Sequence, residues 1–224
     1  MQFRHEYKYQ ISYADYYTLR SRLRTVMRQD AHTGTEGTYR IRSLYFDNLF
    51  DKALREKLDG VDNREKFRIR YYNNDVSFIR LEKKLKQHGL CSKLSCPLTK
   101  EQTEAILQND IEWMKDSKYP LLVELYSKMR GQLLKPKTIV EYEREPYIYR
   151  PGNVRITFDR QVRSGLHHTD LFDASLPTVA GRDDWLLLEV KYDAYLPEVI
   201  ASLLQIQQRR MTAFSKYAVC RTYM

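Results

Sequence analysis

The sequence predicts an α+β protein in which an antiparallel sheet closes into a barrel and carries helices on its outer surface. The first observation is a pair of strongly alternating runs, 66–72 and 78–86. Successive side chains of a strand point to opposite faces, so each run has one apolar face and one charged face. The second observation is the same alternation in several other runs. When such a sheet closes, the charged faces line a lumen.

The two runs form the predicted central hairpin, with its turn at Asn73-Asn74-Asp75. The charged positions are Lys66, Arg68 and Arg70 in the first run and Arg80, Glu82, Lys84 and Lys86 in the second. In a single hairpin, these positions are also typical of the solvated face of an open sheet. Their recurrence on other strands favours the lumen.

Alternation of the same kind predicts the remaining strands. They cover 3–11, 39–46, 90–94, 138–149, 153–163 and 185–192. Charged residues two positions apart mark most of these runs, as Glu6 and Lys8 or Glu189 and Lys191 show.

Each predicted helix begins at a residue suited to a first turn, where a side chain caps free N–H groups or a proline fits. These residues are Ser12 for 12–29, Asp47 for 47–58, Thr99 with Gln102 in capping-box spacing for a helix past Ile106, Pro120 for 120–134, and Pro197 for 197–209. We expect these helices to cover the outside of the barrel.

The length of 224 residues suits a single domain over 1–224, and the content of 8 Gly and 7 Pro predicts no long linker. A formal net charge of +9 indicates a polyanionic partner, such as nucleic acid, a phosphorylated metabolite, polyphosphate or anionic lipid. The first residues lack the apolar segment of a signal peptide, and no run is long enough for a transmembrane segment. We therefore expect a cytoplasmic protein.

Cys91, Cys96 and Cys220 are too few and too irregularly spaced for a zinc site or a full set of disulfides, which favours a reducing compartment. No Gly-rich phosphate loop is present, so ordinary nucleotide-binding folds are disfavoured. Nucleic acid is not the expected partner, because the sequence holds no recognisable motif and a closed tunnel is too narrow for a duplex.

Arginine forks and lysine ammonium groups match phosphate oxygens, and a run of phosphates needs several of them. The candidates on charged strand faces are Lys8, Arg40, Arg42, Arg68, Arg70, Lys84, Arg144, Arg155 and Lys191. The alternative is a salt-bridged face in contact with solvent.

Glu189 stands out among the acids because it follows three leucines in a strongly apolar strand. Together with Glu6 and Glu82, it could hold a divalent metal ion beside bound phosphates. Each of these carboxylates could equally neutralise the lysine nearby, and the sequence leaves both readings open.

Several motifs carry a resemblance to a known family, and they follow one another along nearly the whole chain. They are Glu6–Tyr9, Ile41–Asp47, Lys66–Tyr71, Leu81–Lys84, Val154–Asp159, Leu188–Lys191 and Phe214–Tyr217. Together they resemble the VTC domain, the polyphosphate polymerase module of the vacuolar transporter chaperone. This domain lies in the triphosphate tunnel metalloenzyme (CYTH-like) superfamily, and the present chain is similar to its stand-alone bacterial type.

The resemblance implies an eight-stranded, closed antiparallel tunnel with helices packed around it. It also implies a transferase that moves the γ-phosphoryl group of ATP to a growing polyphosphate chain with Mn²⁺ (or Mg²⁺) as cofactor. The catalytic contacts would come from Lys8, Arg68, Arg70, Lys84, Arg155 and Lys216. Further phosphate contacts would come from Arg40, Arg42, Lys93, Arg144 and Lys191, and the metal ligands from Glu189, Glu6 and Glu82.

Two other functions fit the same predicted tunnel. Water in place of the phosphate acceptor would make the protein a triphosphate or nucleotide hydrolase. A tunnel without turnover would be a binding module for polyphosphate or another polyanion. The oligomeric state is open.

Overall fold

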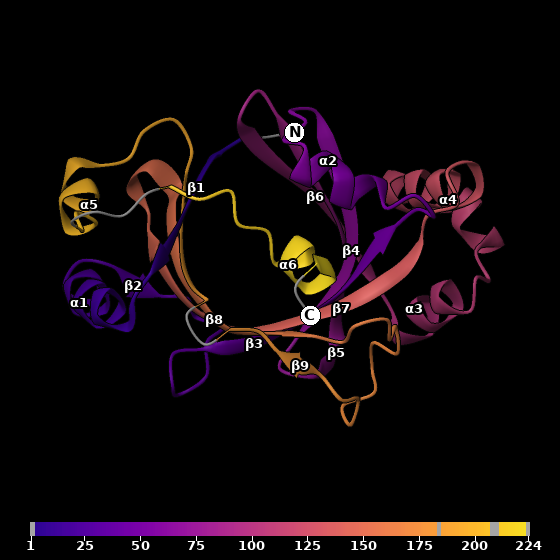
Figure 1. Ribbon diagram of the computed structural model, residues 1–224, viewed down its shortest axis with the longest axis horizontal. Coiled ribbons are helices and arrows are strands. Elements are labelled where there is room, and N and C mark those ends of the chain that lie inside the picture. Colours follow the sequence, from indigo (N-terminus) through magenta and orange to yellow (C-terminus); the bar gives the residue numbers. More distant parts are fainter. Residues whose placement is uncertain (1–2, 183–184, 207–210, 223–224) are drawn as a thin grey trace.

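The structure is a computed structural model that describes residues 3–182, 185–206 and 211–222. One antiparallel sheet dominates it and curls strongly, with helices at both of its sides (Figure 1). The main strands, in spatial order, are β1 (His5–Ile11), β10 (Leu186–Tyr192), β8 (Val154–Ser164), β7 (Lys135–Tyr149), β3 (Tyr39–Asp47), β4 (Arg64–Tyr72), β5 (Asp75–Gln87) and β6 (Leu90–Leu98). Two short strands lie outside this order and pair with interior strands, β2 (Arg28–Gln29) with β7 and β9 (Val179–Ala180) with β8.

The sheet is an open, strongly curled half-barrel, which corrects the prediction of a closed one. Its edge strands β1 and β6 meet only at a bridge, where the amides of Arg4 and Cys91 donate to each other's carbonyls at 2.9 and 3.0 Å. Continued antiparallel pairing beyond Arg4 would require the residues before Cys91. Those residues form the β5–β6 hairpin turn at His88 and Gly89, so the ladder ends there.

Two tight hairpins fix the register of the charged strands. Asn73 and Asn74 have φ values of 49° and 59°, and His88 and Gly89 have φ values of 50° and 78°. Two consecutive positive φ values are typical of type I′ turns, whose twist matches that of paired strands. The predicted turn at Asn73-Asn74 is thereby confirmed, and β4 and β5 pair with their charged positions opposite each other.

The helices confirm most predicted starts. Helix α1 (Tyr13–Arg24) begins at a capping box between Ser12 and Asp15, and α3 (Lys100–Leu107) at one between Thr99 and Gln102. The others are α2 (Lys52–Leu58), α4 (Pro120–Gly131), α5 (Glu198–Leu203) and α6 (Lys216–Thr222), with short 3₁₀ turns at Glu112–Asp116 and Pro151–Asn153.

Four helix predictions need correction. One is the helix predicted over 120–134, which ends at Gly131. The first helix ends at Arg24 and not at Gln29, because Arg28–Gln29 pair with β7 instead. The second begins at Lys52, although the Asp47 carboxylate does cap it by accepting the amides of residues 53 and 54. The fifth is shorter than predicted, and residues 207–209 of that prediction lie outside the described part.

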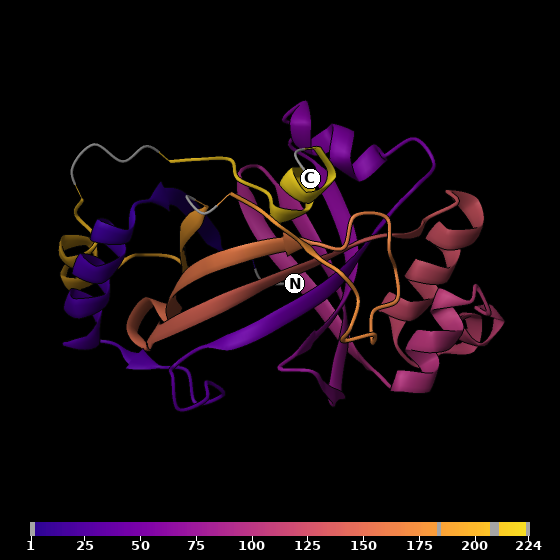
Figure 2. The same cartoon turned by 60° about the horizontal axis from the view of Figure 1, so that its bottom comes forward.

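Two apolar layers cover the outer face of the sheet, one at each side (Figures 1 and 2). Helices α3 and α4 pack on β3 to β6 through residues such as Leu122 and Ile69, and helices α1 and α5 pack on β8, β10 and β1 through Leu19 and Ile156. Burial of one such side chain contributes about 1.5–3 kcal/mol. Because these outer positions are apolar, the alternate positions of most strands carry charged residues on the inner face. A third apolar cluster also lies on the inner side, where Tyr45 and Tyr142 pack with Leu54 of α2 and Tyr217 of α6. Helix α2 therefore does not cover the outside of the sheet as predicted. None of the described helices has the length and apolar character needed to span a membrane.

Candidate active site

The inner face of the sheet encloses a cavity of about 360 Å³. Strands from every part of the sheet contribute to its wall, because alternate side chains of each strand point inward. The structure brings these predicted residues together in that wall: Glu6, Lys8, Arg68, Arg70, Lys84, Lys93, Arg144, Arg155, Glu189, Lys191 and Lys216. We call this cavity the lumen.

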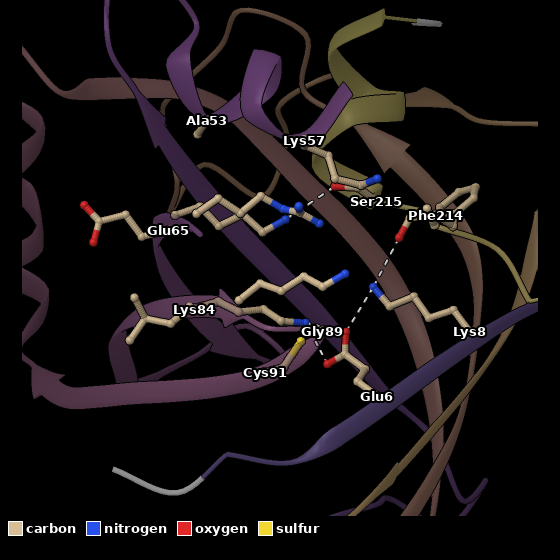
Figure 3. Close-up of a pocket in the computed structure, with 15 residues that line it drawn as sticks. Glu6, Lys8, Ala53, Lys57, Glu65, Lys84, Gly89, Cys91, Phe214 and Ser215 are labelled. Atoms are coloured by element: carbon tan, nitrogen blue, oxygen red, sulfur yellow. Dashed lines mark hydrogen bonds and ion pairs between the residues drawn. The ribbon is translucent and has the colours of Figure 1, made fainter. Parts of the chain in front are cut away.

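Glu6 and Glu189 lie at the centre of one charged group in the lumen. The Lys84 ammonium lies 2.6 Å from Glu6 Oε2, and the Lys191 ammonium lies 2.8 Å from Glu189 Oε2. Lys8 contacts both acids, at 3.3 Å from Glu6 and 3.5 Å from Glu189. Figure 3 shows Lys8 beside Glu6. Burial would raise the pKa of Glu189, but Lys191 and Lys8 outweigh it and hold that pKa well below its usual range. Both acids are therefore ionised at neutral pH.

Glu82 organises a second group on another wall. Its carboxylate accepts from Arg68 at 2.6 Å and from Lys93 at 2.9 Å, and Arg70 lies 3.8 Å away. Hydroxyl groups complete the positioning, because Arg68 donates to Tyr45 and Arg70 donates to both Ser43 and Tyr142. The two predicted guanidinium groups are thus held rigidly, with their forks fixed at the surface of the lumen.

Asp159 is a residue of the site that the sequence did not single out. It is fully buried and accepts two hydrogen bonds from Arg144, at 2.6 and 2.7 Å, and one from Lys216 at 2.5 Å. The sequence does contain an indication of its role: Asp159 follows Arg155 by four residues and therefore lies on the same face of the strand. Arg155 itself is held separately, by Asp30 at 2.8 Å and by a tyrosine hydroxyl at 2.7 Å.

Arg40 and Arg42 do not line the lumen, so the structure does not bring them together with the other predicted phosphate ligands. Both point to the outer face, where Glu141 lies 3.7 Å from Arg40 and 3.3 Å from Arg42. Arg42 also donates to the carbonyl of Asp173 at 2.7 Å. The inner face of β3 belongs to the alternate residues, among them Ser43, and a shift of one residue exchanges the faces of a strand.

Lys66 differs from the other cations of the lumen. It has no carboxylate partner among the described residues, and its ammonium lies 3.4 Å from Ser215 Oγ and 5.8 Å from the ring centre of Tyr45. Burial, followed by the charges of Lys84, Lys8 and other cations, lowers the pKa of Lys66 to about 7. The pKa of Tyr45 is also about 7, because Arg68 and Lys66 outweigh the opposite effect of burial. Among the described residues, no carboxylate forms an ion pair with Lys66 in this part of the lumen.

The carboxylates of Glu6 and Glu189 fit a hard divalent ion, since Mn²⁺ and Mg²⁺ prefer oxygen ligands. No group of three or more potential ligands occurs in the part of the chain that the structure describes, so phosphate oxygens would have to complete the coordination. Glu82, the third predicted ligand, does not join this pair, because Arg68 and Lys93 engage it elsewhere. The predicted set of metal ligands is therefore reduced to two.

Comparisons with known proteins agree with this geometry. The VTC domain matches residues 3–224. No curated protein matches the chain by sequence. Among solved structures, a proposed adenylyl cyclase from Hippeastrum with a dominant triphosphatase activity has a TM-score of 0.55, with 14% identity over 100% of this chain and 96% of that one. A protein from Pyrococcus horikoshii OT3 has a TM-score of 0.50, with 13% identity over 96% of this chain and 97% of that one.

Identities this low show the fold alone, and the fold is that of the CYTH-like triphosphate tunnel proteins. The family follows from the sequence match, which extends over almost the entire chain. The chain, with its lumen of inward-facing cations, belongs to the VTC domain family.

Proposed function

We propose that this protein is a metal-dependent polyphosphate polymerase, which transfers the γ-phosphoryl group of ATP to a growing polyphosphate chain in the lumen. The observation that carries the proposal is the convergence of fixed cations from facing strands on one cavity, in a chain of the VTC domain family. A linear polyanion needs such a series of positive charges along its path.

The chemistry requires no protein nucleophile. An oxygen of the terminal phosphate of the polymer attacks the γ-phosphorus of ATP, the bond from that phosphorus to the bridging oxygen breaks, and ADP leaves. Such a transfer depends on positioning and on neutralising charge at the equatorial oxygens. Arg68 and Arg70 suit that task, because Glu82 and neighbouring hydroxyls orient them before substrate binds. Glu6 and Glu189 would hold Mn²⁺ or Mg²⁺, which supplies further neutralisation of phosphate charge.

Hydrolysis of triphosphates is the second candidate. The Hippeastrum protein shares the fold and has a dominant triphosphatase activity, and water can take the place of the acceptor phosphate. The two reactions give different products. Synthesis yields a polymer ladder, whereas hydrolysis yields free phosphate.

The deciding experiment incubates the purified protein with ATP and Mn²⁺, resolves polyphosphate on a urea gel and assays free phosphate in parallel. A ladder from the wild type supports the polymerase. Free phosphate without a ladder would indicate a hydrolase. The absence of both products would indicate a protein that binds polyanions without turnover.

Substitution of Glu189 separates binding from turnover. Glu189→Gln should abolish the ladder, because one of the two carboxylates proposed to hold the metal ion is lost. Without metal, the same variant should bind inorganic tripolyphosphate more tightly than the wild type, since a buried negative charge is gone. Calorimetry in the presence of EDTA measures this. Glu143→Gln, on the outer face of β7 beside Arg160, is the matched control and should change neither property. Unaltered synthesis by Glu189→Gln would contradict the assigned role.

The affinity for tripolyphosphate should depend on pH through Lys66. The amine is half neutral near pH 7 in the empty lumen, and a bound anion favours its charged form, so binding takes up a proton. Affinity should therefore fall as pH rises above 7, by up to about tenfold per pH unit for one proton. Lys66→Arg keeps the charge and should flatten this dependence between pH 7 and 9. Tyr45→Phe is measured beside it, because Tyr45 titrates in the same range. An identical pH profile for wild type and Lys66→Arg would refute the linkage.

A further inference from the structure

A second, smaller cavity lies beside the lumen, and we call it the side pocket. Its volume is about 110 Å³, and Figure 3 shows the side chains around it. Lys57 of α2, Arg64 at the start of β4 and Lys86 near the end of β5 line it and do not line the lumen. We propose that the side pocket is a second anion subsite, which takes the distal phosphates of a linear polyphosphate whose terminal phosphates occupy the lumen. The choice of polyphosphate as the ligand rests on the proposed function.

The side pocket and the lumen are adjacent and share part of their walls. Lys8, Lys66, Lys84 and Ser215 line both cavities. Lys66 and Lys84 are also direct partners across the β4–β5 ladder, so their side chains stand next to each other on the inner face. A linear chain of phosphates can thus pass from one cavity to the other while it stays in contact with cations.

The side pocket has an excess of positive charge that no acid balances. Among the described residues, no carboxylate forms an ion pair with Lys57, Arg64 or Lys86. Glu65 borders the pocket, but its carboxylate pairs with Lys83 at 2.8 Å and with Lys128 at 2.5 Å. The other bordering acid, Glu6, is already engaged by Lys84. Arg64 also donates to the carbonyl of Val61, which leaves its charge unneutralised. The positive charges of all three side chains are therefore available to an external anion.

These cations also repel one another. Burial, followed by the charges of Arg64, Lys8 and Lys86, lowers the pKa of Lys57. Ordinary surface lysines point into water and relieve such repulsion, whereas here several half-buried cations face one small space. A bound anion removes the repulsion, so the arrangement favours a ligand of high negative charge density.

The size of the side pocket indicates phosphate groups and not a nucleoside. Pockets for drug-sized ligands measure about 300–1,000 Å³, and the side pocket is well below that range. The one aromatic ring at its border, Phe214, packs edge-on against Trp185 with ring centres 5.7 Å apart, and it is thereby engaged within the protein. A chain of phosphates without a base is the ligand that fits.

The test compares a short and a long ligand on one double variant, Lys57→Gln with Lys86→Gln. Calorimetry in EDTA measures the affinity for inorganic tripolyphosphate and for long-chain linear polyphosphate. Tripolyphosphate fits in the lumen, so its Kd should change by no more than about twofold, the effect of screened charges at a distance. Long-chain polyphosphate should lose about 10- to 100-fold in affinity, because two charge-assisted contacts are removed.

The matched control is Lys52→Gln with Arg55→Gln, which removes the same amount of positive charge from α2, at positions outside the side pocket. It should leave both affinities unchanged, and thermal unfolding should confirm that both double variants fold. Equal weakening for both ligands, or an unchanged affinity for the long polymer, would overturn the subsite while the lumen assignment stands. Failure of the wild type to bind tripolyphosphate would instead overturn the proposed function, and the subsite with it.

Discussion

Replacement of Arg70 by alanine should lower polyphosphate synthesis by about 10²- to 10³-fold, the usual cost of losing one preorganised donor to transition-state charge. The guanidinium is buried in the wall of the lumen, and Ser43 and Tyr142 fix its position before substrate binds. Folding should change little. Arg70 is the most distant cation around Glu82, at 3.8 Å. The closer partners Arg68 and Lys93 would remain in the variant and keep Glu82 paired.

Initial rates of ladder formation, measured beside urea unfolding, check this expectation. Arg70→Lys should restore part of the rate, because it returns the charge without the planar fork. Arg160→Ala removes an arginine from the outer face of β8, where Glu143 is its partner, and should leave the rate unchanged. Wild-type rates from Arg70→Ala would remove Arg70 from the catalytic set.

Replacement of Asp159 by asparagine should cost about 3–5 kcal/mol of unfolding free energy, the range for a buried charge that loses its partner. The carboxylate is fully buried and pairs with both Arg144 and Lys216. Asparagine has nearly the same shape, so the loss reflects charge and not a cavity. The two cations would then face each other and the rest of the lumen without their common anion.

Urea unfolding of wild type and Asp159→Asn measures this difference. Burial would raise the pKa of Asp159, but Arg144 and Lys216 hold it below its usual value. A depressed pKa gives stability that is fully present above the unfolded pKa, near 4, and is lost as pH falls through the folded value. The two proteins should therefore differ most at neutral pH and converge in acid. Glu143→Gln, which breaks a more exposed pair, should cost no more than about 1 kcal/mol. A comparably small loss from Asp159→Asn would contradict the structural role given to the ion pair.

The sequence predicted the inner face of most strands, because one side of each alternation is plainly apolar. Strand β3 is the exception. All of its residues except Arg40 are buried, so both of its faces look alike and alternation does not tell which one points inward. Arg42 is consequently a buried cation of the outer face, where Glu141 and a loop carbonyl satisfy it.

The residues that the sequence missed act through partners far away in the chain. Asp159 accepts from Lys216, which is 57 positions away, and Tyr142 accepts from the predicted Arg70, which is 72 positions away. Only the register of the whole sheet brings such pairs together, and a bulge in the β7–β8 ladder shifts that register locally. Helix α6 escaped prediction because its seven residues are too few for a periodic apolar pattern.

The weak contact between the edge strands β1 and β6 affects how a polymer can enter the lumen. A tube with a continuous wall admits a long polymer only when one end is threaded through it. Here two amide hydrogen bonds between Arg4 and Cys91 connect the edge strands, and each contributes only about 0.5–1.5 kcal/mol. The ion pair from Glu6 of β1 to Lys84 reaches past β6 to the next strand, β5. The wall is therefore weakest along one line, and separation there would let the middle of a polymer be laid in sideways, without a search for its free end.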